Sequence, residues 1–393
     1  MDRQVDSLQT SKKFKKTEIG EIPVDWEVMK IGELLGMEYG KGLIEEMREK
    51  GKFPVVGSNG IVGYHNRYCV KGPGIVIGRK GTIGAVTWVE PDFWPIDTTY
   101  YIELIRNDMS KRWLYYKLTS LNLEKLNMAT GIPGLNRNIV YSSLIGIPSL
   151  EEQKIIAEIL TNVDDAIKKS DMVIDKTKQL KKGLMQELLT RGIGHKKFKK
   201  TEIGEIPVDW QVVKLGNVAS INMGQSPSSS NYFDYENGLP FFQGKTEFGD
   251  KYPSIGKWCN SPTKIAEKGD ILISVRAPVG DINIAPARCC IGRGLAAIRG
   301  TQSDNIFLFF LMNYYKKTLA QVGQGGTFEA INRDVLYELL IPFPPLPEQK
   351  KIAEILTRVD EEIDKAVENR EKMSTIKRGL MQVLLTGRVR VKV

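Results

Sequence analysis

Apolar residues recur in alternating steps of four and three positions along two stretches of the chain. The stretches cover residues 149–190 and 347–386, and neither contains a proline beyond its first position. This spacing places the apolar side chains on one stripe of an α-helix, with Lys, Glu and Asp on the other faces, as in a coiled coil. The pattern therefore predicts two long helices, and we call their stripe the seam.

The seam explains why the two helices should lie together. Its apolar positions are Ile156, Leu160, Val163, Ile167, Ile174, Leu184, Leu188, Ile352, Leu356, Val359, Ile363, Met373, Leu380 and Leu384. Small or polar residues continue the same spacing at Ser170, Thr177, Lys181, Ala366, Arg370 and Lys377. A helix of about 40 residues is ~60 Å long, and a single one with an exposed seam is not stable in water. We expect an antiparallel pair, because a globular segment separates the helices along the chain.

The alternative is that each helix packs only on its own domain. A domain of ~135 residues is roughly 30 Å across, about half the length of the helix. The length therefore favours pairing of the two helices.

Outside the helical stretches, short apolar runs are interrupted by glycines, which is typical of strands and tight turns. The predicted strands lie within 53–70, 72–89, 98–105, 144–148, 239–244, 269–285, 292–300 and 339–342. One helix is predicted in each half, over 110–126 and 304–322. The expected fold class is α+β, with two α/β domains separated by a pair of long antiparallel coiled-coil helices.

The chain repeats itself. FKKTEIGEIPVDWEV begins at Phe14 and FKKTEIGEIPVDWQV at Phe198, 184 positions later, whereas Gln153 and Gln349 of the helical motifs are 196 positions apart. The second half therefore contains 12 extra residues, which weaker matches place mainly between 244 and 269. Near-identical ends around a divergent middle indicate one task performed on two different targets. The alternative is an old duplication whose middle drifted without functional reason.

The repeat and the helical pattern divide the chain of 393 residues, which is longer than one ordinary core allows. The predicted parts are a first domain at 14–148, a helix at 149–190, a linker at 191–197, a second domain at 198–346 and a helix at 347–386. We expect the halves to be related by a pseudo-two-fold axis.

Composition narrows the class of protein. Hydrophobic residues make up 41% of the chain and charged residues 26%, as in soluble globular proteins. The formal charge of +9 is a mild bias toward polyanionic partners, so any nucleic-acid binding should use local patches.

Several classes are disfavoured by what the sequence lacks. The first residues contain no apolar signal segment, and the apolar run at 306–312 is too short to span a membrane. The four cysteines form no C-x-x-C pair, and the two histidines are too few for a His-rich metal site. We expect a cytoplasmic protein without a metal.

No catalytic motif is recognisable. The sequence contains no phosphate-binding G-x-x-x-x-G-K-[ST] loop, no G-x-S-x-G nucleophile turn and no Asn-Pro-Pro-Tyr-like tetrapeptide of adenine methyltransferases. The better interpretation is that this chain has no active site. Two alternatives stay open: a methyltransferase or nuclease with an unrecognised site, and a coiled-coil adaptor that binds no DNA.

Polar residues in or beside Gly-rich turns are the candidate DNA contacts, because Arg and Lys bind guanine edges or phosphates and Asn and Gln read adenine. These residues are Lys41, Ser58, Asn59, Arg79, Lys80, Thr82, Asn136, Arg137, Gln225, Ser226, Gln243, Lys245, Thr246, Arg276, Arg293, Asn332 and Arg333. Each taken singly is more often a solvated loop residue. The Asn-Arg pairs at 136–137 and 332–333 are equally well explained as structural turns in which Asn caps the next element.

Aromatic residues interleave with these loops and offer faces for base stacking, although such residues are usually core or rim. They are Tyr39, Tyr64, Tyr68, Tyr232, Phe233 and Tyr235. Trp26 and Trp210, in the repeated V-D-W, are predicted to be hydrophobic staples of the scaffold. The serine-rich run at 226–231 is predicted to be a flexible loop.

These features resemble one known family. The repeated G-E-I-P-x-D-W, the helix start E-Q-x-x-I-A-x-I-L and the helix end K-x-G-L-M-Q-x-L-L-T resemble the specificity (S, HsdS) subunit of type I restriction-modification systems. The resemblance covers residues 14–386, nearly the whole chain, and occurs twice. It implies two target-recognition domains joined by an antiparallel coiled coil.

The resemblance also implies function. Such a subunit binds double-stranded DNA and has no catalysis of its own. It assembles with two methyltransferase (M) subunits, which methylate adenine with S-adenosylmethionine, and with restriction (R) subunits. No cofactor is then expected in this chain, whereas S-adenosylmethionine, ATP and Mg are expected on the partners, in the cytoplasm of a bacterium or archaeon and away from membranes.

Overall fold

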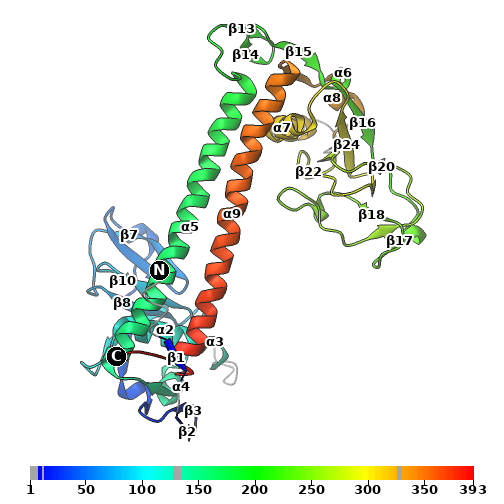
Figure 1. Cartoon of the computed structure of the whole chain (residues 1–393). Coiled ribbons are helices and arrows are strands. Elements are labelled where there is room, and N and C mark those ends of the chain that lie inside the picture. Colours follow the sequence, from blue (N-terminus) through cyan, green and yellow to red (C-terminus); the bar gives the residue numbers. More distant parts are fainter. Residues whose placement is uncertain (1–7, 11–12, 127–133, 325–329) are drawn as a thin grey trace. The chain divides into compact units, whose positions relative to one another are not determined.

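The computed structural model describes residues 8–10, 13–126, 134–324 and 330–393 (Figure 1). The chain divides into two compact units, one formed by Met1–Asp171 with Glu368–Val393 and the other by Met172–Val367. Each unit contains one α+β domain, the start of one long helix and the end of the other. We call them unit 1 and unit 2.

Both domains are built on a four-stranded antiparallel sheet with the same strand order, β5-β11-β8-β9 in unit 1 and β16-β24-β21-β22 in unit 2. The strands are β5 (Leu35–Tyr39), β8 (Gly74–Gly78), β9 (Val86–Val89), β11 (Thr99–Leu104), β16 (Ala219–Met223), β21 (Ile271–Ser274), β22 (Ile282–Ile284) and β24 (Leu295–Gly300). Buried isoleucine, valine and leucine side chains fill β8 and β21, which are central strands. Three strands of each sheet lie within predicted strand segments, and these predictions are confirmed. The edge strands β5 and β16 were not predicted.

A second, smaller sheet differs between the domains. Unit 1 has the order β10-β6-β7, whereas unit 2 has β17-β19-β18-β23-β20. The strands are β6 (Phe53–Gly57), β7 (Gly60–His65), β10 (Trp94–Pro95), β17 (Tyr232–Phe233), β18 (Leu239–Phe242), β19 (Trp258–Cys259), β20 (Ile265–Ala266) and β23 (Cys289–Ile291). The 12 extra residues of the second half fall in this region, as the sequence predicted.

Paired strands of three or four residues complete the β-structure. They are β1 (Leu8–Thr10) with β26 (Val389–Val391), β2 (Phe14–Thr17) with β3 (Gly20–Pro23), β4 (Glu27–Lys30) with β12 (Leu144–Ile147), β13 (Phe198–Thr201) with β14 (Gly204–Pro207), and β15 (Gln211–Lys214) with β25 (Leu340–Phe343). The repeated opening segments therefore form the β2–β3 and β13–β14 hairpins, which the sequence analysis did not predict.

The helix predicted over 110–126 is two helices, α2 (Lys111–Ser120) and α3 (Leu123–Leu126), so this prediction was wrong in its extent. Asn122 lies between them with a φ of 49°, a left-handed conformation that ends a helix. The second prediction is confirmed by α7 (Asn305–Gln324). The remaining short helices are α4 (Arg137–Ser142), α6 (Leu215–Val218), α8 (Arg333–Glu338), η1 (Ile31–Glu33), η2 (Glu45–Met47), η3 (Ser229–Asn231) and η4 (Lys245–Glu247).

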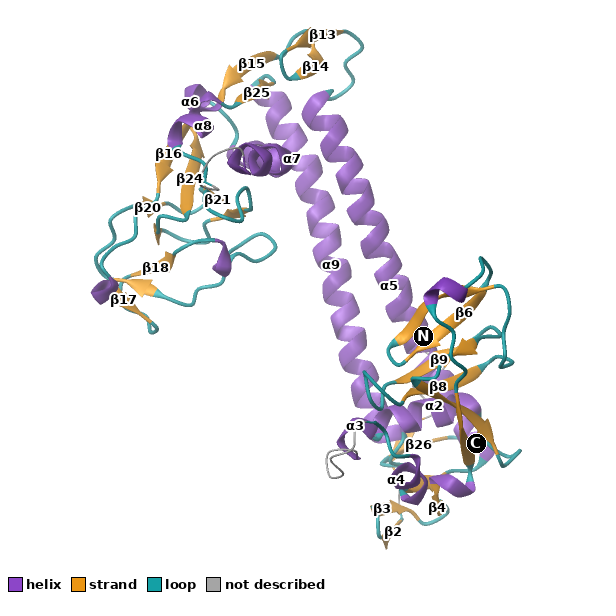
Figure 2. Ribbon diagram, turned by 180° about the vertical axis from the view of Figure 1, so that it is seen from behind, coloured by secondary structure: helices purple, strands orange, loops and turns teal. Residues whose placement is uncertain are grey.

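The two long helices are α5 (Leu150–Thr190) and α9 (Leu346–Leu384), and they run side by side in Figures 1 and 2. The seam positions are buried or half-buried throughout. The predicted helices and their antiparallel pairing are confirmed.

Polar seam residues fix the register of this pair. Lys377 Nζ is 2.6 Å from Asp164 Oδ1, and Arg370 Nε is 3.1 Å from Asp171 Oδ1, both in unit 1. In unit 2, Lys181 Nζ is 2.5 Å from Asp360 Oδ1. The two residue numbers have the same sum in all three pairs, as an unshifted antiparallel register requires. Charged partners at seam positions specify register and pairing.

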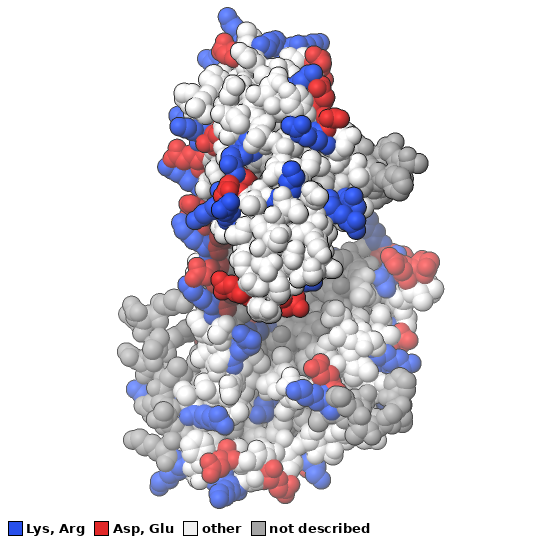
Figure 3. All heavy atoms as spheres, turned by 90° about the vertical axis from the view of Figure 1, so that its right-hand side faces the viewer, with Lys and Arg blue, Asp and Glu red and all other residues white. Residues whose placement is uncertain are grey.

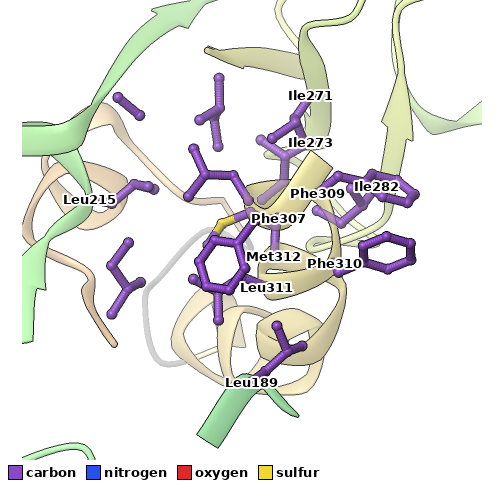
Figure 4. Packing of buried hydrophobic residues seen from close by; sticks show 14 of the residues in the cluster. Leu189, Leu215, Ile271, Ile273, Ile282, Phe307, Phe309, Phe310, Leu311 and Met312 are labelled. Carbon is purple, nitrogen blue, oxygen red and sulfur yellow. The ribbon is translucent and has the colours of Figure 1, made fainter. Parts of the chain in front are cut away.

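Each domain also packs on both helices. The core of unit 1 includes Ile156 and Leu160 of α5 and Leu384 of α9. In unit 2, Leu189 at the end of α5 points toward Phe307 and Leu311 of α7 (Figure 4), within a core that also includes the start of α9. The alternative that helices pack on domains is thus partly right: the helix ends pack on domains, and the rest of the seam is buried in the pair.

The repeated E-Q motif anchors each domain to its helix. Trp26 Nε1 donates to Glu152 Oε2 at 3.1 Å, and Trp210 Nε1 donates to Glu348 Oε2 at 3.0 Å. The adjacent glutamine caps the domain helix: the side-chain oxygen Oε1 of Gln153 accepts from the backbone N–H of Ser110, just before α2, at 2.9 Å. The repeated tryptophans are therefore buried scaffold residues, as predicted, with a polar link to the long helices.

Candidate nucleic-acid interface

In unit 1, the predicted contact residues gather at one end of the four-stranded sheet, around Tyr39. The Tyr39 ring is 51% exposed and stands at the end of β5. The Arg79 guanidinium lies 5.3 Å from the ring centre and the Arg137 guanidinium 5.2 Å. Two cations therefore flank one exposed aromatic face, an arrangement suited to a phosphate or a base. We call these three residues the Tyr39 cluster.

Backbone carbonyls hold both arginines in place. Arg79 donates from Nη2 to the Asp97 carbonyl oxygen at 2.7 Å, and Arg137 donates from Nη1 to the Met37 carbonyl oxygen at 3.4 Å. These acceptors are uncharged backbone oxygens, so neither hydrogen bond pairs a guanidinium with a carboxylate. Burial raises the pKa of the adjacent Tyr100 to about 12, and its hydrogen bond with Tyr39 adds to this shift.

A tight turn brings the other predicted residues of unit 1 to the same place. A side chain at Gly78 would lie 2.1 Å from the Thr82 carbonyl oxygen and 2.7 Å from that of Ser58, so only glycine fits there. Lys80 and Thr82 are exposed on this turn, and Asn59 is exposed on the neighbouring one. Lys41, also exposed, is joined to the same edge through its backbone N–H, which donates to the Pro95 carbonyl.

Asn136 and Asn332 have the structural role that the sequence left open. The Asn136 side chain accepts from the backbone N–H of Asn138 as the N-cap of α4, and that of Asn332 accepts from Val335 as the N-cap of α8. The arginines that follow differ, because Arg137 joins the Tyr39 cluster whereas Arg333 is exposed.

In unit 2, the predicted residues form a different cluster. Gln243 Nε2 donates to Ser226 Oγ at 2.9 Å, and the Arg293 backbone N–H donates to the same oxygen at 3.2 Å. The exposed Gln225 is held beside them, since its N–H donates to the Ile291 carbonyl. The exposed Arg276 lies on the turn of unit 2 that corresponds to the Lys80 turn of unit 1. An amide, a hydroxyl and cationic side chains thus meet at one edge.

Lys245 is engaged within the domain, and the exposed Thr246 follows it in η4. Lys245 and Lys316 both pair with the carboxylate of Asp281. Burial raises the pKa of Asp281, but the hydrogen bonds from the two lysines more than offset this effect and lower it overall. Lys245 thus has a structural role as an ion-pair partner of Asp281. Any contact of Lys245 with DNA is made while it also holds this carboxylate.

The aromatic candidates divide into two groups. Tyr64, Tyr68 and Tyr235 are exposed, whereas Tyr232 stacks on Phe241 with 4.6 Å between ring centres. Phe233 is half-buried beside them. Only the exposed rings offer a face for bases. The predicted flexibility of 226–231 stays a prediction.

The two domains share the turn, and each has an exposed cation on it, Lys80 or Arg276, but the residue before that cation differs. In unit 1 the Arg79 backbone N–H donates to Thr98 and its carbonyl accepts from Leu135. In unit 2, 196 positions later, Val275 makes the same two bonds. Valine therefore replaces Arg79, and the β16 strand ends in Met223 where β5 ends in Tyr39. One scaffold presents two different sets of groups.

On the face drawn in Figure 3, lysine and arginine side chains alternate with acidic ones. Among the described residues, no group of three or more His, Cys, Asp or Glu side chains is arranged to hold a metal ion. Of the helices that the structure describes, none is long and apolar enough to cross a membrane.

Two cysteines of unit 2, Cys289 and Cys290, have thiols that are not activated. Burial raises the pKa of the Cys289 and Cys290 thiols to about 12, so both are protonated at neutral pH. A thiol of this kind is a poor nucleophile.

The profile of a family described as the type I restriction modification DNA specificity domain matches residues 23–173 and 207–372. The chain belongs to this family. The two matches coincide with the two domains and the starts of the two long helices, in agreement with the repeat. The chain is 38% identical over 414 residues to a Methanocaldococcus jannaschii protein provisionally named the MjaX type I restriction enzyme specificity subunit, which covers 96% of this chain and 97% of the relative.

Further relatives agree. The MjaVIII specificity subunit of the same organism is 30% identical over 436 residues, or 96% of each chain. A solved structure, described as the structural basis of complex assembly and conformational transition of the type I R-M system, is 27% identical with a TM-score of 0.60 over 93% of this chain and 99% of that one. The type I S subunit from M. genitalium shares the fold, with a TM-score of 0.66, 17% identity, and 96% and 99% coverage.

Proposed function

We propose that this chain is the DNA-recognition subunit of a type I restriction-modification complex. Each domain binds one half of a bipartite, asymmetric target in double-stranded DNA, and the α5–α9 pair sets the gap between the halves. The observation that carries the proposal is the repeated turn with unlike side chains, Arg79 in one domain and Val275 in the other. Two readers on one scaffold recognise two unlike half-sites.

Affinity and sequence selection are expected to come from different groups. Held guanidiniums such as those of the Tyr39 cluster supply phosphate contact, which fixes position and depends on salt. Amides such as Gln243, and the apolar groups near them, contact base edges, which carry the sequence.

The repeated surface supports two equivalent docking sites for methyltransferase subunits. Residues 14–26 and 198–210 are identical, although Glu21 and Val24 and their counterparts are exposed. Packing does not require identity at such positions, because surface substitutions change stability by only about 0.5 kcal/mol. Binding of the same partner at both places does require identical exposed residues. Restriction subunits would join this assembly.

The chemistry is proposed to belong to those partners. S-adenosylmethionine, ATP and Mg would bind to the methyltransferase and restriction subunits, and this chain would hold no cofactor and catalyse no step.

Domain exchange tests the proposal. Residues 29–147 are replaced by the corresponding domain of a relative, and methylated positions are mapped in cells that also express the methyltransferase subunits. We expect one half-site to change while the other half-site and the gap stay the same. A change in both half-sites would show that the domains are not independent readers.

Gel shifts with the purified complex at several salt concentrations distinguish the alternatives. A DNA-recognition subunit gives binding that weakens as salt increases, whereas an adaptor gives none. Purified chain without partners, incubated with DNA and labelled S-adenosylmethionine, is expected to transfer no label. Label transfer would indicate a methyltransferase.

A further inference from the structure

The β7 strand of unit 1 carries an unusual amount of exposed apolar surface. Ile61 is 53% exposed, Val62 46% and Tyr64 55%. In the order β10-β6-β7, this strand lies at the edge of its sheet. An exposed apolar edge strand favours association, and proteins usually cover or charge such edges. The β6–β7 hairpin is therefore a contact surface.

The charge around the hairpin indicates an anionic partner. Residues 41–80 contain eight Lys and Arg against three Asp and Glu, a net +5 of the total +9. The corresponding residues 225–276 contain six of each and have no net charge. Arg48 Nη1 donates to the Val62 carbonyl oxygen at 2.9 Å, which places a guanidinium directly on β7.

The hairpin also continues the candidate interface. Its tip, Ser58 and Asn59, touches the turn that carries Arg79: a side chain at Gly81 would lie 3.0 Å from Ser58 Oγ. A ligand bound across the Tyr39 cluster thus meets the β6–β7 hairpin next. Nucleic acid satisfies both surfaces, since it offers phosphates to the cations and base edges to the apolar groups.

The difference between the domains points to the same element. The main sheet and its turn are repeated, and in unit 2 the antiparallel pair β18–β19 takes the place of β6–β7. The two pairs differ, because β19 has only two residues, lies far along the chain from β18, and has β17 paired to its outer side, whereas β7 follows β6 in a tight hairpin and forms the edge. If two domains of the same fold recognise two unlike DNA sequences, the side chains that contact bases lie where the domains differ.

We propose that the β6–β7 hairpin enters the major groove of the first half-site, where Ile61 and Val62 recognise thymine by contact with its C5-methyl group. The major groove admits a two-stranded β-ribbon, and the thymine methyl is its one apolar base feature. The Tyr39 cluster then holds the adjacent backbone. This inference rests on the proposed function and adds the groove, the element and the base feature.

Removal of single methyl groups from the DNA tests the contact. The target of the complete complex, which contains the chain and its methyltransferase subunits, is mapped first. Duplexes are then prepared in which uracil replaces one thymine of the first half-site at a time. We expect the parent complex to lose about tenfold in affinity at one or two positions, within the usual range for a mismatched base pair.

The protein side uses matched variants. Ile61→Ala and Val62→Thr are expected to bind the thymine duplex about tenfold more weakly and to be insensitive to uracil at the same positions. Val62→Thr keeps the β-branched shape, so the strand is retained. Ile105→Ala is the control, because Ile105 is 61% exposed but follows the opposite end of β11, beside Leu34.

Several outcomes would overturn the inference. One is a parent complex that selects the target yet tolerates uracil at every position of the first half-site. Another is loss of methyltransferase subunits from the Ile61 and Val62 variants with unchanged DNA selection, which would make the hairpin a protein-docking surface. Absence of any salt-dependent, sequence-selective binding by the parent would instead refute the proposed function itself.

Discussion

Extension of the helix pair by one heptad tests whether α5 and α9 set the gap between half-sites. Seven residues are inserted after Asp171 in α5 and seven after Val367 in α9, at the boundary between the units. The insertion leaves both flanking ion pairs, Lys377–Asp164 and Lys181–Asp360, inside their own units. Because both helices gain the same length, the antiparallel register is kept.

The magnitude follows from helix geometry. Seven residues at 1.5 Å each add about 10 Å, which is about 3 base pairs at 3.4 Å per pair. A heptad completes about two turns in a coiled coil, so the seam returns to nearly the same direction. The DNA, in contrast, turns by roughly 100° over 3 base pairs, since a full turn takes about 10.5. We therefore expect a longer gap with slower methylation.

The assay is mapping of methylated positions in cells that express the variant with its methyltransferase subunits. The expected motif has the parent half-sites and a gap about 3 base pairs longer. Insertion into α5 alone is the matched control, because it shifts the register and prevents the flanking ion pairs from forming together. An unchanged gap in the double insertion would refute the ruler.

Three further results are expected. Lys117, buried in α2, has a pKa lowered to about 8 by burial, whereas the repeat has Leu311 at this position. A lysine with a pKa below its ordinary 10.5 destabilises the fold while charged, so parent stability should rise between pH 8 and 10.5. The lowered pKa corresponds to an unfavourable free energy of ~3 kcal/mol at pH 7. Replacement of Lys117 removes this cost but also removes its hydrogen bond to the Leu385 carbonyl oxygen. Lys117→Leu should therefore stabilise unit 1 by about 1–2 kcal/mol in urea unfolding at pH 7 and remove the pH dependence. A destabilised variant with an unchanged pH profile would contradict it. Glu152→Gln should lower the stability of unit 1 by about 3 kcal/mol, because it leaves the charged Arg390 without its buried partner. Glu348→Gln should lower the stability of unit 2 by less. Calorimetry that finds equal losses in the two variants would contradict this difference. Arg79→Ala should weaken DNA binding by the complex and reduce the slope of log affinity against log salt by about one, and an unchanged slope would exclude a phosphate contact.

The Glu152 prediction rests on a contact that closes unit 1. Arg390, near the end of the chain, donates from Nε to Glu152 Oε1 at 2.7 Å and from Nη2 to Asp25 Oδ2 at 2.6 Å. The hydrogen bond from Arg390 lowers the pKa of Asp25. In unit 2, His195 Nε2 lies 2.9 Å from Glu348 Oε1 in the equivalent place. The partner of the glutamate is an arginine in unit 1 and a histidine in unit 2, and for this reason we expect unequal losses of stability from the two glutamate substitutions.

Periodicity and repetition predicted most of the architecture, because both can be recognised in the order of residues along the chain without knowledge of spatial contacts. The apolar spacing gave α5 and α9, and the repeat gave the equivalence of the two domains. The break at Asn122 was missed because nothing in the surrounding apolar pattern is interrupted there. The polar seam pairs were also missed: Lys181 and Lys377 fit the spacing, but their aspartate partners come from the other helix.

The candidate site was predicted as a set more successfully than residue by residue. Glycines in tight turns identified the edge where Arg79 and Arg137 meet, and Tyr39 was among the predicted stacking residues. Its position beside both guanidiniums emerges only from the folded sheet. Lys245 is partly committed to Asp281, which is remote in sequence. Selection among polar loop residues depends on such long-range partners, which spacing along the chain does not contain.

Mapping of modified bases across the genome of a host that carries this chain with its methyltransferase subunits tests the central claim most directly. A matched host from which only this chain is deleted is the control. The account predicts methylated adenine in a motif of two unlike half-sites separated by a fixed gap, present only in the first host. An identical methylation pattern in both hosts, or a motif without a gap, would contradict it.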